Sequence, residues 1–188
     1  MRFCTRYYAI IALLATIAAC KEPSLGQGEA EEGKIPQDAV VEILTEGGKL
    51  YWGISAMRGT ETTTLNGVQM ALLDPSKIPS MKALRQQLSG VFTNHAIDSL
   101  IVDLGIKESA GKLWIPAADP GDVSVYEDAD VTQSVERGDT VLVTVDVPLG
   151  DSGQSDLRGV RLVRVGNDWR IDNNPFTDVE TADDEPSD

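Results

Sequence analysis

Residues 111–130 read GKLWIPAADPGDVSVYEDAD, and this stretch separates two parts of the chain that have different hydrophobic patterns. Before it, apolar residues recur at helical spacing, whereas after it they alternate with polar residues as they do in strands. Apolar runs at 113–115 and 123–126 flank a centre that combines turn-forming residues with two carboxylates: Pro116, Asp119, Pro120, Gly121 and Asp122. Because Pro and Gly favour turns, we predict a strand, a loop and a second strand at the junction of two layers.

The chemistry of this loop favours binding over catalysis. Asp119 and Asp122 are accompanied by no base, nucleophile or cluster of metal ligands in the stretch. Acid–base catalysis would need two differently tuned carboxylates or a catalytic metal, and the acidic spacing does not match a calcium loop. We therefore interpret the loop as a surface that contacts a partner, and we expect no enzymatic activity, no cofactor and no metal site.

The first 19 residues have the pattern of a secretory signal peptide, because two arginines precede an apolar run over residues 7–19. That run is shorter than the roughly 20 apolar residues that a membrane-spanning helix needs. Ile17-Ala18-Ala19-Cys20 is similar to a bacterial lipobox, which implies cleavage before Cys20 and lipid attachment to its thiol. We expect a membrane-anchored lipoprotein of the bacterial cell envelope. Lys21 favours the outer membrane if the organism is Gram-negative.

Cysteine and histidine usage restricts the chemistry further. Cys4 would leave with the signal peptide and Cys20 would be acylated, so the mature chain would have no free thiol and no disulfide. His95 is the single histidine, so neither a multi-histidine metal site nor a Cys–His pair can form. Thr93 or Asn94 would cap a helix and place His95 on the surface of its first turn. We expect folding to be indifferent to reductants and chelators.

Charge and composition divide the chain. The formal net charge is -14, so nucleic acid is excluded as a partner and a basic protein surface would be attracted. Residues 21–34 have the composition of a flexible tether, and residues 177–188 carry acids without a basic residue, which is typical of disorder. We predict a signal peptide at 1–19, a lipidated tether at 20–34, a folded domain at 35–176 and an acidic tail at 177–188.

Helical periodicity dominates the first half of the folded region. Pro36 suits a first helical position, and apolar residues recur at helical spacing from residue 40 to residue 57. Gly47-Gly48 within this helix indicates either a break or close packing against another backbone. Residues 58–67 are polar and Thr-rich, as in a loop or an edge ribbon. Ser80 precedes two amphipathic helices, which are divided near residues 93–94 and ended by Gly105.

The second half has the period of strands. Valines at 141, 143, 145 and 147 alternate with other residues, and further strands are predicted at 160–165 and around Trp169 and Ile171. Tight turns are expected at 138–139 and 166–167. The sequence therefore predicts an α+β fold, with N-terminal helices followed by a mainly antiparallel β-sheet. Trp52, Trp114 and Trp169 each have apolar neighbours, which favours core packing over ligand stacking.

Several segments, in order, resemble the IseA-type inhibitors of bacterial cell-wall DL-endopeptidases. They cover about residues 37–175 and are the following: Leu50-Tyr51-Trp52, Phe92-Thr93-Asn94-His95-Ala96, Gly111-Lys112-Leu113 through Pro116-Ala117-Ala118-Asp119 to Gly121, Val147-Pro148-Leu149-Gly150-Asp151-Ser152, and Trp169-Arg170-Ile171 with Asn174-Pro175.

This resemblance implies a two-lobed, bracket-like α+β domain that presents an acidic loop to the catalytic cleft of a papain-like, NlpC-type peptidase. Such enzymes cut peptidoglycan stem peptides between D-glutamate and diaminopimelate, so an acidic loop would imitate the anionic substrate. The matching loop here is Pro116–Asp122, in which Pro120 occupies a position where a small residue is expected.

An alternative is a nuclear-transport-factor-2-like domain, which also places helices before a curved antiparallel sheet. Such domains often finish on a Trp-x-Ile strand, as Trp169-Arg170-Ile171 does here. This alternative would bind a small molecule in a cone-shaped pocket, and a deep apolar pocket would favour it.

Overall fold

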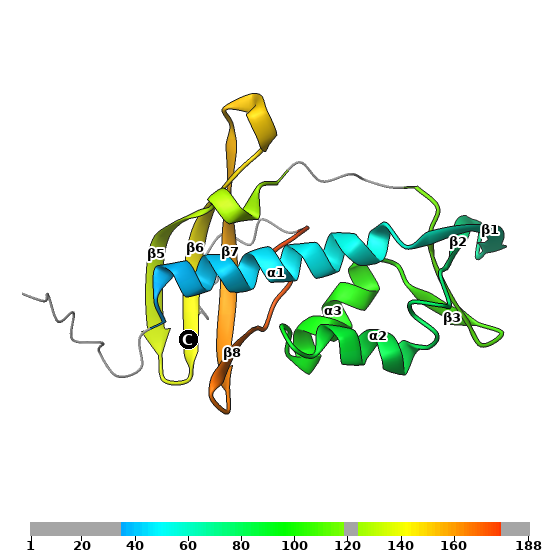
Figure 1. Ribbon diagram of the computed structural model, residues 1–188, viewed down its shortest axis with the longest axis horizontal. Helices are drawn as coiled ribbons and strands as arrows, with labels where there is room; N and C mark the ends of the chain where they lie inside the picture. The colour runs from blue at the N-terminus through cyan, green and yellow to red at the C-terminus, as the bar shows by residue number, and fades with distance from the viewer. Residues whose placement is uncertain (1–34, 119–123, 178–188) are drawn as a thin grey trace, which may run out of the picture. The chain divides into compact units, whose positions relative to one another are not determined.

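The structure is a computed structural model of the 188-residue chain, and it describes residues 35–118 and 124–177 (Figure 1). By its internal contacts the chain divides into a unit of residues 1–32 and a unit of residues 33–188, and all the described residues belong to the second unit. The predicted signal peptide, Cys20 and the tether up to residue 34 lie outside the described residues. So do the loop residues 119–123 and the tail from residue 178 onward.

The prediction of an α+β fold is confirmed. The helices are α1 (Gln37–Ser55), α2 (Met81–Leu88) and α3 (Asn94–Asp103). Sheet A has the order β1-β2-β4-β3, with β1 (Arg58–Leu65), β2 (Val68–Leu73), β3 (Lys107–Ser109) and β4 (Lys112–Pro116). Sheet B has the order β5-β6-β7-β8, with β5 (Asp130–Arg137), β6 (Thr140–Pro148), β7 (Ser155–Val165) and β8 (Asp168–Ile171). Both are antiparallel, and the β1–β2 hairpin precedes α2, so the helices do not all come first.

Helix α1 runs without a break through Gly47-Gly48, and Pro36 is its N-cap rather than its first helical residue. The glycines allow side chains, not another backbone, to approach the helix. A Cβ on Gly47 would lie 2.8 Å from Cδ1 of Ile171, and one on Gly48 would lie 2.7 Å from Cδ2 of Tyr126. Close packing rather than a break therefore explains the pair.

The two helices predicted after Ser80 are present with the predicted caps. The hydroxyls of Ser80 and Thr93 accept hydrogen bonds from the backbone N–H groups three residues later, at Ala83 and Ala96. Such caps satisfy N–H groups that lack a partner within the helix. Gly105 follows α3 with a φ of +62°, as expected for a helix terminator. His95 is exposed in the first turn of α3, which confirms its prediction as a surface residue.

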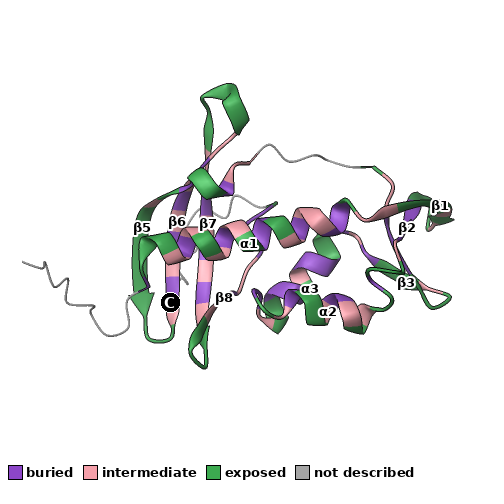
Figure 2. Cartoon of the chain, in the orientation of Figure 1, coloured by how far each residue is buried: buried purple, intermediate pink, exposed green. Residues whose placement is uncertain are grey.

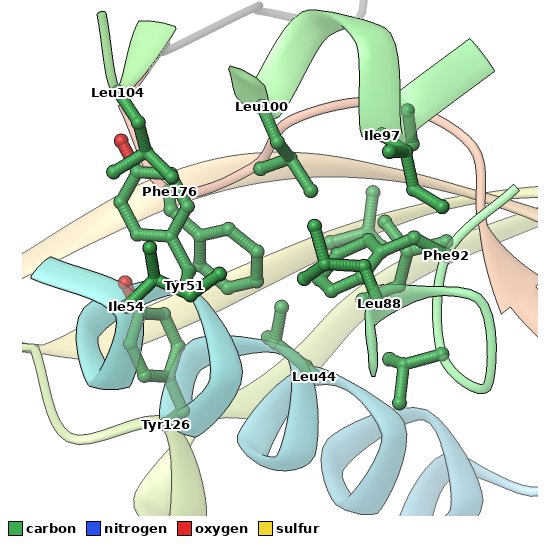
Figure 3. Close-up of a cluster of buried hydrophobic side chains, with 14 of the residues drawn as sticks. Leu44, Tyr51, Ile54, Leu88, Phe92, Ile97, Leu100, Leu104, Tyr126 and Phe176 are labelled. Carbon is green, nitrogen blue, oxygen red and sulfur yellow. The ribbon is translucent and has the colours of Figure 1, made fainter. Parts of the chain in front are cut away.

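Sheet B has one buried face. The four valines of β6 at 141, 143, 145 and 147 are buried, as are Val160 and Leu162 of β7. The tight turns predicted at 138–139 and 166–167 are present and join β5 to β6 and β7 to β8, whereas β7 begins at Ser155, earlier than predicted. Helix α1 contacts β5, β8 and the 3₁₀ turn η1 (Tyr126–Asp128). Figure 3 shows the cluster in which Leu44, Tyr51 and Ile54 of α1 meet Phe92, Tyr126 and Phe176.

The second strand predicted at 123–126 is wrong. Ser124 makes only an isolated antiparallel bridge with Leu149, and Tyr126 begins η1. The physical reason is that the strands on the two sides of the loop belong to different sheets, β4 to sheet A and β5 to sheet B. Residues 124–126 therefore have no neighbouring strand with which to extend a ladder. The Tyr126 side chain instead packs against Gly48 and, edge-on, against Phe176.

The tryptophans pack as predicted. Trp114 is 6% exposed and belongs to a small cluster with Met70 and Leu72 in sheet A. Trp52 and Trp169 are half-buried against the main core. Among the described helices, none has the length and apolar content to cross a membrane.

Candidate functional site

The structure describes the two ends of the predicted binding loop. Pro116 is the last residue of β4 and pairs with Met70 of β2. Asp119, Pro120, Gly121 and Asp122 lie outside the described residues. We call residues 116–118 the N-terminal stem and residues 124–126 the C-terminal stem. The first leaves sheet A and the second leads into sheet B.

Arg58 holds the N-terminal stem. Its Nε donates to the carbonyl of Pro116 at 2.9 Å, and its Nη2 donates to the carbonyl of Ala118 at 3.1 Å. Its Nη1 donates to the carbonyl of Ser55, the last residue of α1. A guanidinium presents its donors in a rigid plane, so this one side chain connects the end of the helix to two points of the stem. The Ala117 N–H adds a 3.0 Å bond to the carbonyl of Gln69 in β2.

Arg158 holds the C-terminal stem from within sheet B. It is 8% exposed and faces the buried side of β7. Its Nη2 donates to the hydroxyl of Ser124 at 2.9 Å, and its Nη1 donates to the hydroxyl of Tyr126 at 2.7 Å. Asp156 lies 3.5 Å from its Nε and compensates its charge. Because a buried cation is costly unless it is paired and hydrogen-bonded, this network favours a single position for the stem.

Backbone pairing adds to the support of the C-terminal stem. Ser124 bridges Leu149, and the Val125 N–H donates to the carbonyl of Pro148 at 2.9 Å. The stem is thereby joined to the end of β6. Exposed carboxylates continue directly after it at Glu127 and Asp128. The acidic character of the predicted loop thus extends into described, exposed positions.

Sequence reasoning missed both arginines. Arg158 carried a detectable signal, because it stands in phase with the buried Val160 and Leu162 of an alternating strand, where a cation is unusual. Arg58 carried none, since it begins a polar, Thr-rich ribbon and its acceptors are carbonyls of a segment 58 and 60 residues later.

The described residues hold no group of three or more His, Cys, Asp or Glu side chains arranged to bind a metal ion. A surface hollow of about 530 Å³ lies between α3 and β7. Its lining is mainly polar or charged and includes His95, Asp98, Asp103 and Arg161. The nuclear-transport-factor-2-like alternative called for a deep apolar pocket, and this hollow gives it no support.

Two sheets joined by a loop with fixed stems define an α+β scaffold that presents a loop. A family model described as IseA DL-endopeptidase inhibitor matches residues 31–175. The chain belongs to this family, whose role is to inhibit cell-wall endopeptidases. No curated protein matches the chain.

Proposed function

We propose that this protein is a non-catalytic lipoprotein of the cell envelope that binds and inhibits a papain-like, NlpC-type peptidoglycan DL-endopeptidase through the acidic loop Pro116–Asp122. The family match over residues 31–175 carries the proposal. The fixation of the two stems by Arg58 and Arg158 supports the choice of this loop as the contact element.

The loop would act as a substrate mimic. Asp119 and Asp122 imitate the anionic stem peptide in the catalytic cleft, and Pro120 restricts the backbone of the loop. Stems that are already held in place reduce the conformational entropy lost on binding, which favours affinity. The strong negative charge of the chain steers it toward a basic enzyme surface.

Replacing both Asp119 and Asp122 with Asn tests the loop. The double variant should remain folded, because substitutions at exposed sites change stability by about 0.5 kcal/mol or less. Inhibition of peptidoglycan hydrolysis by a DL-endopeptidase should weaken, since losing a charged contact at a desolvated interface costs about 2 to 5 kcal/mol.

The matched control removes the same charge elsewhere. Glu108→Gln and Asp168→Asn, both at exposed positions of other strands, should leave inhibition unchanged. If the loop variant is folded and inhibits as well as the wild type, the contact surface lies elsewhere, although the family role would stand.

The lipid anchor at Cys20 is the second part of the proposal, and the lipobox-like Ile17-Ala18-Ala19-Cys20 supports it. Anchoring would hold the inhibitor at the membrane, with the outer membrane favoured in a Gram-negative organism. Cys20→Ser should move the protein from the membrane fraction to the soluble fraction in a cell-fractionation blot, with Cys4→Ser as the control. A Cys20→Ser protein that stays in the membrane pellet would rule out this anchor.

A further inference from the structure

The strands of sheet B have a second face that no part of the proposed function uses. We call it the outer face, and it lies opposite the face formed by the buried valines of β6. Strand register places alternate residues on it: Asp130 pairs with Asp146, which pairs with Leu157, and the third row after this one holds Arg137 at the other end of β5.

The outer face is open in the described part of the chain. The residues of β6 that point to it are all partly exposed, whereas their neighbours on the other face are all buried (Figure 2). Three large apolar side chains on it are well exposed, at 36% for Val135, 53% for Leu157 and 39% for Val165. A sheet face with this mixture of apolar and charged side chains is suited to contact another protein surface.

Charge is distributed unequally along this face. One end carries Asp130 directly opposite Asp146, a cross-strand pair of like charges, which is unfavourable in isolation. The other end carries Arg137 and Arg170, with Asp168 beyond Arg170 on the same face. The face therefore has an acidic end and an end at which basic side chains outnumber acidic ones.

We propose that the outer face of sheet B binds a second copy of this chain in a two-fold symmetric dimer. In such a dimer the same patch serves both copies, so a face with opposite charges at its two ends complements itself when one copy is reversed. Two sheets that pack face to face in an aligned manner keep their strands within about 30° of each other. If the two-fold axis lies between the sheets and runs across the strands, the acidic end of one copy lies over the basic end of the other.

The register then fixes the contacts. Arg137 lies over Asp130 of the second copy, and Asp130 lies over Arg137 of that copy. Val163 meets Leu157 of the second copy. The charged pair and the apolar pair each occur twice because of the symmetry.

This dimer is independent of the inhibitory role. Arg158, which holds the C-terminal stem, points to the opposite face of β7. The dimer would therefore use one side of sheet B and the loop support the other, so a dimer remains able to present two loops.

Charge reversal tests the dimer by sedimentation equilibrium on the chain from Lys21 onward, which contains the whole compact unit of residues 33–188. The wild type should dimerise as its concentration is raised. Arg137→Asp and Asp130→Arg should each be monomeric, because each places like charges at both pairs. Mixing the two single variants should restore a dimer, since every pair then joins opposite charges.

Glu136→Arg is the matched control, because Glu136 is exposed and adjacent to Arg137 but points to the other face of β5, so this variant should dimerise like the wild type. A wild type that stays monomeric at all concentrations overturns the proposal, as does an equimolar mixture that stays monomeric. If thermal melts show that a reversal variant is unfolded, Arg137→Gln replaces it, and undiminished dimerisation by that variant also overturns the proposal.

Discussion

At the scale of single residues, Arg58 is the clearest link between scaffold and loop. Its guanidinium joins the carbonyl of Ser55 at the end of α1 to those of Pro116 and Ala118. The position of the N-terminal stem thus depends on a planar group with several donors. The sequence could not predict this role, because backbone carbonyls leave no signature in the residues that provide them.

Arg58→Lys should leave the domain folded and weaken inhibition of a DL-endopeptidase roughly tenfold, which equals about 1.4 kcal/mol of binding free energy. An ammonium keeps the charge but cannot reproduce the planar set of bonds. The measurement is an inhibition constant beside a thermal melt.

Arg85→Lys provides the control for that variant, because Arg85 makes an exposed ion pair with Asp98 and should tolerate lysine. Unaltered inhibition by folded Arg58→Lys would mean that the stem does not depend on this guanidinium.

At the scale of elements, the sequence predicted best where local signals and tertiary packing agree. Caps at Ser80 and Thr93 marked α2 and α3, and strict alternation marked β6. Strand β2 was missed because its residues from Met70 to Leu73 are consecutively buried, which removes the period of two. The strand predicted at 123–126 failed because its pairing depends on which sheet each neighbour joins, and that is a long-range property.

Helix α1 offers a test of close packing. Gly48→Ala should destabilise the domain by about 1 to 3 kcal/mol, because its Cβ would lie 2.7 Å from the Tyr126 ring and overpack the core. The gain in helix propensity from replacing Gly, about 1 kcal/mol, offsets only part of that. Chemical denaturation measures the change.

Gly53→Ala is the matched control in the same helix, since a Cβ there would meet nothing within 4 Å. Propensity alone should then act, and the domain should gain up to about 1 kcal/mol. Equal effects of the two substitutions would contradict the role given to Gly48.

At the scale of the whole molecule, the family and the α+β class could be predicted from the order of short segments, and both are confirmed. The existence of two separate sheets could not. Sheet A is assembled from strands on both sides of α2 and α3, and its short strands carry little periodic signal. The binding role of the loop stays a prediction from its composition, and the arginines that hold its stems come from distant segments, which composition does not reveal.

The central claim is that the acidic loop occupies the catalytic cleft of a papain-like DL-endopeptidase. Its most direct test is the rate at which iodoacetamide alkylates the catalytic cysteine of that enzyme, measured by mass spectrometry with and without the inhibitor. The wild type should slow alkylation strongly, and the Asp119→Asn/Asp122→Asn variant at the same concentration should protect much less. Alkylation at an unchanged rate in the presence of saturating wild-type inhibitor would contradict occupation of the cleft.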